Sequence, residues 1–245
     1  MKISTLMPAH NAAEWITEAI QSALAQTHSD LELLIYDDHS TDDTLAVAQF
    51  AARGDARVKV WAAEGERNCS YARNFLYQKA QGEVIFHLDA DDTCSPSRVE
   101  RQLKHLLETD LVFNCTYLEA GAEIWKQSIT ALDGLKRMAT NQKAFAGNSC
   151  AYRRILHERN IWHDTRWEWG LDVLFEARIM AEFYPRLGTL AEPLYKYRLH
   201  PQQYCRQVME GRVGLAADYY ATMSKEMHMV LDAICLRELG ALPKL

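Results

Sequence analysis

The chain has 245 residues, of which 48% are hydrophobic and 24% charged, so disordered and collagen-like proteins are excluded. Its formal net charge of -6 argues against nucleic acid as a partner, because nucleic-acid binding normally requires a basic face. The sequence has no run of about 18 apolar residues, which excludes a membrane span.

The six cysteines are scattered and include no Cys-x-x-Cys pair of the kind that zinc sites and redox motifs use. The chain also lacks the cysteine density of small disulfide-bonded domains. The residues after Met1 have neither a basic segment leading into an apolar stretch nor an acid-poor amphipathic pattern, so we expect no targeting segment. We therefore expect a cytoplasmic protein with reduced thiols, and peripheral contact with the inner face of the membrane remains open.

The first ninety residues alternate between short apolar runs and amphipathic segments. The apolar runs predict strands at residues 3–7, 31–36, 58–61 and 84–88. Between them we expect a helix after Asn11, a helix over 40–54 and a helix over 70–80. Asn11 and Glu14 have the spacing of a helix capping box. Strands that alternate with helices predict a parallel sheet covered on both faces.

The second half is less regular. Ser95 and Pro96 suit the N-cap and first position of a helix that follows them. Residues 111–118 and 151–152 are strand-like, 162–169 form an aromatic-rich loop, and 171–183 have helical spacing. Residues 205–239 are mostly helical and rich in Met and Tyr. We divide the chain into 1–95 and 96–204, two halves of one domain, and a helical segment over 205–245.

Polar clusters follow three of the predicted strands directly: Ala9-His10-Asn11, Asp37-Asp38 and Asp89-Ala90-Asp91-Asp92. In parallel sheets ligands bind beyond the carboxyl ends of the strands. The clusters therefore predict a functional site at that edge.

Carboxylates as close in sequence as Asp89, Asp91 and Asp92 repel one another unless a cation lies among them. Mg²⁺ or Mn²⁺ relieves the repulsion and can bridge to substrate phosphates. The alternative is a solvated turn that caps the next helix, although ordinary turns do not require three carboxylates. Asp37-Asp38 also suits a capping turn, but a second acidic cluster favours contact with a base N–H or ribose hydroxyl.

The sequence resembles the family 2 glycosyltransferases, which have the GT-A fold. The matching segments are Met7-Pro8-Ala9-His10-Asn11, Gln26-Thr27-His28, 33–38 with Ser40-Thr41-Asp42, Ala72-Arg73-Asn74 and Leu88-Asp89-Ala90-Asp91-Asp92. They occur in the family's order and spacing over about the first hundred residues. The resemblance implies an α/β fold with a Rossmann-like, mostly parallel sheet. It makes 1–95 the nucleotide-sugar-binding half and 96–204 the acceptor-binding half.

The resemblance also implies roles for individual residues. The residues expected to bind the nucleotide are Pro8, Ala9, His10, Asn11, Asp38, Arg73 and Asp89. Of these, Arg73 is expected near the uracil or phosphates, and Asp89 is expected to hold the ribose. Asp91 is the expected metal ligand, and Asp92 is a further candidate. His10 stands where the family more often has tyrosine.

Two places in the second half also resemble the family. Gly170-Leu171-Asp172-Val173 is similar to its acceptor-side acidic motif, with leucine where glutamate is common. Asp172 is then the candidate catalytic base, since a helix N-terminus favours the ionised form; the alternative is a helix cap. Tyr197-Arg198-Leu199-His200 resembles a motif found late in many of these enzymes, in which the histidine completes the metal site or approaches the diphosphate; the alternative is a structural histidine. Trp167 and Trp169 either contact the acceptor sugar or belong to the core.

These resemblances imply an inverting, Mn²⁺- or Mg²⁺-dependent transfer of one sugar from a nucleotide-sugar, in the first instance a UDP-sugar. The implied acceptor is a saccharide or lipid-linked saccharide of bacterial polysaccharide or lipopolysaccharide biosynthesis. The sequence lacks the Q-x-x-R-W element of processive members. For a lipid-linked acceptor, the Met- and Tyr-rich C-terminal helices are the expected docking surface.

Two alternatives stay open. Asp89-Ala90-Asp91-Asp92-Thr93 also spells the D-x-D-x-T motif of haloacid-dehalogenase-like phosphatases, with Asp89 as nucleophile. That motif normally ends the first strand of its domain, whereas three strand-helix units precede it here. The second alternative is a protein that binds nucleotide-sugars without transferring them, which the leucine before Asp172 allows.

Overall fold

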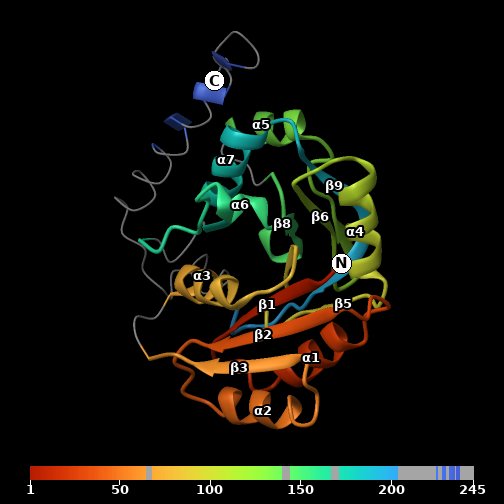
Figure 1. Cartoon of the computed structure of the whole chain (residues 1–245), viewed down its shortest axis with the longest axis vertical. Coiled ribbons are helices and arrows are strands. Elements are labelled where there is room, and N and C mark those ends of the chain that lie inside the picture. Colours follow the sequence, from red (N-terminus) through yellow and green to blue (C-terminus); the bar gives the residue numbers. More distant parts are fainter. Residues whose placement is uncertain are drawn as a thin grey trace.

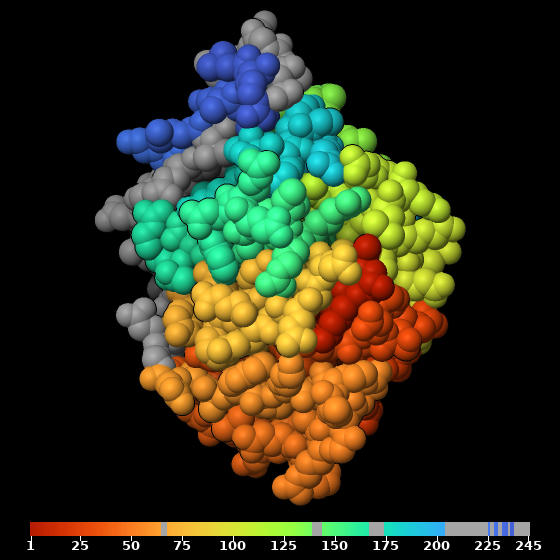
Figure 2. Space-filling model, viewed as in Figure 1, coloured from red at the N-terminus to blue at the C-terminus, as the bar shows by residue number. Residues whose placement is uncertain are grey.

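The computed structural model describes residues 1–64, 68–139, 144–166 and 171–203, and residues 225, 228–229, 232–234 and 236–237. For residues 139 and 171–173 it describes the backbone alone. Within these residues the chain forms a mixed sheet in the order β3-β2-β1-β4-β8-β6-β9-β5, with β7 paired to β6 (Figure 1). Figure 2 shows the red and orange N-terminal residues in the lower part of the visible face and the green residues above them.

The first half is the predicted parallel sheet. Its strands are β1 (Ile3–Ala9), β2 (Leu31–Asp37), β3 (Val58–Ala62) and β4 (Val84–His87). Neighbours in the order β3-β2-β1-β4 all pair in parallel, so the four carboxyl ends lie at one edge. The expected strands are confirmed to within two residues at each end.

Helices cover both faces of this sheet. They are α1 (Ile16–Leu24), α2 (Thr44–Ala51) and α3 (Cys69–Lys79). In β2, Leu33 and Ile35 pack into the cluster that contains α1 and α2 residues, whereas Leu34 and Tyr36 pack into the cluster that contains α3 residues. This alternation follows from the two-residue period of a strand. Figure 1 shows α2 below these strands and α3 above them.

The second half extends the sheet with antiparallel pairs. Its elements are β5 (Thr93–Cys94), α4 (Arg98–Glu108), β6 (Phe113–Ala120), β7 (Glu123–Trp125), α5 (Ala131–Ala139), η1 (Gly147–Ser149), β8 (Ala151–Arg153), α6 (Ile155–Glu158), α7 (Leu171–Phe183) and β9 (Leu187–Tyr197). Strand β8 lies antiparallel between β4 and β6, and β9 pairs in parallel with β6 and antiparallel with β5. The sheet is therefore mixed at its centre, and the strand-like runs expected near 111–118 and 151–152 are confirmed as β6 and β8.

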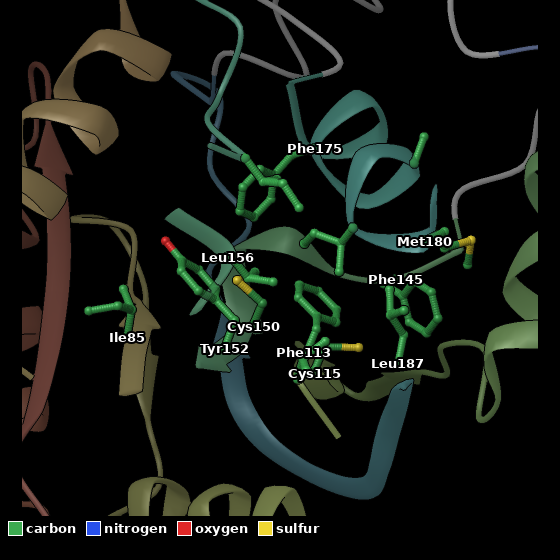
Figure 3. Close-up of a cluster of buried hydrophobic side chains, with 14 of the residues drawn as sticks. Ile85, Phe113, Cys115, Phe145, Cys150, Tyr152, Leu156, Phe175, Met180 and Leu187 are labelled. Carbon is green, nitrogen blue, oxygen red and sulfur yellow. The ribbon is translucent and has the colours of Figure 1, made fainter. Parts of the chain in front are cut away.

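The core beneath the second half is aromatic. Figure 3 shows Phe113, Phe145, Tyr152 and Phe175 gathered between the strands and the helix that carries Phe175. The rings of Phe113 and Phe145 lie 5.7 Å apart edge to face, and those of Tyr152 and Phe175 lie 5.5 Å apart. Edge-to-face contacts of this kind add to the stabilisation from apolar burial.

The expected capping box at the start of α1 is wrong. Asn11 has a φ of 48°, and α1 begins only at Ile16. The Asn11 carboxamide oxygen accepts instead from the backbone N–H of Thr41, at 2.8 Å. Asn11 therefore joins two loops and caps no helix.

Two other helices start later than expected. Helix α2 begins at Thr44, because Ser40 and Asp42 hydrogen-bond to the backbone of the loop after β1. Helix α4 begins at Arg98, because Arg98 N–H bonds the carbonyl of Ser95 in a preceding turn.

The segment 205–245 lies mostly outside the described residues. Those described between 225 and 237 are helical; Ile234 is buried in the same core, and the Arg237 guanidinium donates to the carbonyl of Ala181 in α7 at 2.8 Å. Among the described residues, every helix is too short or too polar to cross a bilayer.

Candidate functional site

The loops after β1 and β2 bind each other directly. The N–H of Asp38 donates to the carbonyl of Ala9 at 2.7 Å, which continues the parallel ladder by one residue. His10 Nδ1 lies 2.8 Å from the Asp38 carbonyl oxygen and must therefore carry the proton. The other ring nitrogen accepts from the Asn11 side chain at 3.0 Å. The imidazole is thus fixed at both nitrogens.

The acidic pair after β2 is buried. Asp37 and Asp38 are 4% and 6% exposed, and Ser40 N–H donates to an Asp37 oxygen at 3.3 Å. Pro8 pairs with Tyr36 in the same ladder. The predicted residues Pro8, Ala9, His10, Asn11 and Asp38 are therefore brought together at one edge of the sheet.

Arg73 joins this edge from α3. The Asn68 side chain caps the helix by accepting from the N–H groups of Ser70 and Tyr71. Arg73 is 5% exposed, and its Nη2 lies 3.3 Å from Asp89 Oδ1. The helix therefore delivers a buried guanidinium to the first carboxylate of the acidic cluster.

The acidic cluster lies immediately after β4. One oxygen each of Asp89, Asp91 and Asp92 falls within 4.8 Å of the other two. A turn in which Asp92 N–H donates to the Asp89 carbonyl at 3.1 Å closes the loop. The three carboxylates that the sequence predicts as a group therefore do converge.

Asp92 is the most buried member, at 1% exposure. Burial raises the pKa of its carboxyl well above the usual 3.8, the charges of Asp91 and Asp89 raise it further, and hydrogen bonds from Arg198 N–H and Tyr195 OH lower it. These donors lie 2.8 Å and 2.7 Å from Asp92 Oδ1 and Oδ2, respectively. Both oxygens of Asp92 are therefore engaged by the end of β9.

His200 reaches the cluster from the segment after β9. Its Nε2 lies 2.9 Å from Asp91 Oδ2, and its ring centroid lies 3.9 Å from that of Trp15. The imidazole is 8% exposed. The structure thus brings together Asp91 and His200, which are 109 residues apart in the chain.

The predicted acceptor-side residues are only partly described. Asp172 is the second residue of α7, in the first turn of the helix, and its side chain lies outside the described atoms. Trp167 and Trp169 lie outside the described residues. Helix α7 contacts η1, and η1 in turn contacts β4, the strand that precedes the acidic cluster.

Sequence reasoning missed three residues of this site, namely Tyr195, Trp15 and Arg198. Tyr195 lies in β9, a strand that the sequence did not predict, and it gives no signal of its own. Trp15 directly precedes α1, and its ring packs on His200. A signal was available for Arg198, which stands in the motif that singled out His200.

Known proteins resemble this chain in sequence and in fold. The family model described as Glycosyl transferase family 2 matches residues 4–159. The Escherichia coli protein WfgD, a UDP-Glc:alpha-D-GlcNAc-diphosphoundecaprenol beta-1,3-glucosyltransferase, is 35% identical over 112 residues, which are 45% of this chain and 43% of that protein. The Bacillus subtilis (strain 168) protein TuaG is 33% identical over 131 residues, 54% of this chain and 50% of its own length. The chain thus spans about half the length of these curated relatives.

Among solved structures, S. aureus TarS in complex with UDP-GlcNAc superposes with a TM-score of 0.76 at 19% identity, over 98% of this chain and 73% of that chain. A mannosyltransferase from Pyrobaculum calidifontis, in complex with GDP-Man and Mn²⁺, gives a TM-score of 0.65 at 17% identity, over 99% and 76% of the two chains. At these identities the likeness shows the fold, which is GT-A. Because the family model matches well over half of the sequence, we conclude that the chain belongs to glycosyl transferase family 2.

Proposed function

We propose that the protein moves a single sugar, with inversion, from a nucleotide-sugar of the UDP class to a hydroxyl of a saccharide or lipid-linked saccharide. The observation that carries the proposal is the convergence of Asp89, Asp91 and Asp92 beside the buried Arg73. The printed name of WfgD, with its UDP-sugar donor and lipid-linked acceptor, supports the substrate classes. Family membership is incompatible with the phosphatase interpretation of Asp89.

The acidic cluster fits a hard divalent cation such as Mn²⁺ or Mg²⁺. Carboxylate oxygens are the ligands such ions prefer, and three lie close enough to share one ion. Asp91 fits best as a metal ligand. Of its two carboxylate oxygens, only Oδ2 hydrogen-bonds to another described residue, and its side chain is 29% exposed. His200 either joins it as a ligand or orients it. The engaged oxygens of Asp92 favour a role in holding the loop.

The residues divide the work of the transfer. Pro8, Ala9, His10, Asn11 and Asp38 hold the nucleoside, Asp89 holds the ribose, and Arg73 contributes positive charge beside the phosphates. When bound, the cation supplies charge that neutralises the departing diphosphate.

Asp172 takes the proton of the acceptor hydroxyl. The hydroxyl oxygen then bonds to the anomeric carbon from the face opposite the nucleotide, and the bond from that carbon to the diphosphate oxygen breaks. The first turn of α7 favours the ionised form of Asp172 that this step needs. Trp167 and Trp169 offer aromatic faces to the acceptor sugar.

Calorimetry of UDP binding with and without Mn²⁺ tests the proposal. Asp91→Ala is expected to weaken binding at least about tenfold and to remove its Mn²⁺ dependence, because the leading metal ligand is lost. Asp133→Ala, at an exposed position in α5, is the matched control. Unchanged affinity and Mn²⁺ dependence in Asp91→Ala would refute the metal site.

Product analysis then tests the reaction itself. Wild-type protein is incubated with UDP-, GDP- and CMP-sugars and a panel of saccharide and lipid-linked acceptors, and the anomeric configuration of the product is read by NMR. We expect a single added sugar of inverted configuration. Tight donor binding without hydrolysis or transfer across the panel would instead identify a binding protein that does not transfer.

A further inference from the structure

Tyr195 is the central contact between β9 and the acidic loop. It is fully buried at 0% exposure. Its hydroxyl donates to Asp92 Oδ2 at 2.7 Å and accepts from the backbone N–H of Asp89 at 3.1 Å. A single phenol thus holds the first and last residues of the loop.

The ring of Tyr195 rests on a buried arginine. Arg98, the first residue of α4, is 1% exposed, and its guanidinium carbon lies 4.9 Å from the Tyr195 ring centroid and 5.7 Å from that of Phe86. Its Nε donates to Gln102 Oε1 at 2.8 Å and its Nη2 to the carbonyl of Cys150 at 3.4 Å. In the described part of the chain no carboxylate forms an ion pair with it.

A buried guanidinium without a carboxylate partner is costly, so its surroundings must compensate for lost hydration. Two aromatic faces and two hydrogen bonds do so in part. The acidic cluster, one tyrosine ring away, is the nearest excess of negative charge that the described contacts connect to Arg98. The Arg98 guanidinium also lies over the ring of the tyrosine whose hydroxyl holds the acidic loop.

Arg198 completes the attachment of the loop to the end of β9. Its backbone N–H donates to Asp92 Oδ1 and its Nε to the Asp91 carbonyl, both at 2.8 Å. These contacts use the Asp91 backbone and the Asp92 carboxylate, and they leave the Asp91 carboxylate facing His200.

We propose that Arg98 and Tyr195 are positioning residues that hold the Asp89–Asp92 loop in the shape that receives a divalent cation. We name this pair the tyrosine latch. The inference rests on the proposed function, because it concerns the same cation. In this arrangement Asp92 supports the loop, and Asp91 binds the cation.

Tyr195→Phe tests the latch, because it removes the hydroxyl and keeps the ring on Arg98. The readouts are Mn²⁺ affinity, measured by calorimetry, and backbone hydrogen exchange of residues 89–92 in metal-free protein. We expect Mn²⁺ affinity to fall about ten- to hundredfold, the range typical when a group that supports a metal ligand is removed. Exchange across the loop should accelerate. Tyr117→Phe, in the adjacent strand β6, is the matched control, since no described residue hydrogen-bonds its phenol.

Arg98→Lys keeps the charge and the Tyr195 hydroxyl but loses the planar group, and we expect a smaller loss of Mn²⁺ affinity in the same direction. It also tests the latch should Tyr195→Phe fail to fold.

Wild-type Mn²⁺ affinity with unchanged loop exchange in a folded Tyr195→Phe protein would overturn the proposal. Lower melting temperature with unchanged Mn²⁺ affinity in Arg98→Lys would reduce Arg98 to a core residue. If the wild type itself bound no Mn²⁺, the proposed metal site would fail first, and the latch with it.

Discussion

His10, Asn11 and Asp38 illustrate how single residues at this site depend on one another. Each nitrogen of the His10 ring is bound, one by the Asp38 carbonyl and one by the Asn11 amide. Asn11 adopts a left-handed φ of 48°, which asparagine tolerates better than most residues. That conformation turns its side chain toward the loop after β2. The identity of each residue is therefore tied to the shape of two loops.

Arg73→Lys gives a prediction at this scale. The guanidinium of Arg73 is buried and contacts Asp89, and lysine lacks the planar fork that can hold a carboxylate and a phosphate together. We expect KM for the nucleotide-sugar to rise about tenfold, with a smaller change in kcat. Steady-state kinetics over a range of donor concentrations measure both constants.

Arg101→Lys is the matched control, because Arg101 is exposed and pairs only with Glu192 among the described residues. A wild-type KM in Arg73→Lys would show that Arg73 orders Asp89 without approaching the donor.

At the scale of elements, α3 links the two halves of the domain. Besides Arg73, it carries Asn74, whose side chain donates to the carbonyl of His163 at 2.8 Å and accepts from its N–H at 3.1 Å. On the other side of the same segment, Arg178 of α7 donates to Asp164 Oδ2 at 2.7 Å. The segment before Trp167 is thus tied to a helix of each half.

Asn74→Ala should loosen this connection. The change leaves the N–H and carbonyl of a buried residue, His163, without their partners, so we expect a loss of about 1–3 kcal/mol in the free energy of unfolding. Urea denaturation measures the loss, and hydrogen exchange should accelerate at residues 161–166.

Gln127→Ala is the control, since its amide makes only an exposed hydrogen bond to Trp125 among the described residues. Equal stability of Asn74→Ala and wild type would show that α7 alone secures the segment.

For the whole molecule, buried histidines set a limit on acid stability. Neither ring nitrogen of His157 or His163 hydrogen-bonds within the described residues. Burial, with a smaller contribution from Arg154, lowers the pKa of His157 to about 3. Burial, and next the charge of Arg73, lowers that of His163 well below its usual value. Folding therefore requires both rings to be neutral.

The resulting pH dependence can be measured on His157→Phe. Between pH 6.5 and about 3, the unfolded chain binds a proton at His157 that the folded protein excludes, so stability falls as the pH falls through this window. From pH 7 to pH 5 the wild type should lose about 2 kcal/mol at this residue. The His157→Phe protein keeps an aromatic ring against Tyr77 and has no imidazole to protonate, so its free energy of unfolding should fall by correspondingly less.

Urea denaturation of both proteins at pH 7 and pH 5 measures the two losses. The raised pKa of Asp92 favours the folded state at low pH, but this effect is the same in both proteins and cancels in the comparison. Equal losses in both proteins would contradict the prediction.

The sequence by itself determined the parallel half of the sheet, its helices and the grouping of acidic residues at its carboxyl edge. Apolar runs and helical spacing are local signals, and parallel strands bring their ends together whatever the rest of the chain does. Segment order and spacing also identified the family, which the family model confirms. The roles of the individual site residues remain predictions.

Only the tertiary structure decided how the second half completes the site. Strand β9 was missed because Gly188 and Pro193 interrupt its pattern and its pairing with β6 shifts register. The capping box failed because Asn11 finds a better partner thirty residues away, in the loop after β2. Contacts such as Tyr195 with Asp92 and His200 with Asp91 join residues more than a hundred positions apart. No local spacing encodes such distances, since they arise only when long-range strand pairing brings the segments together.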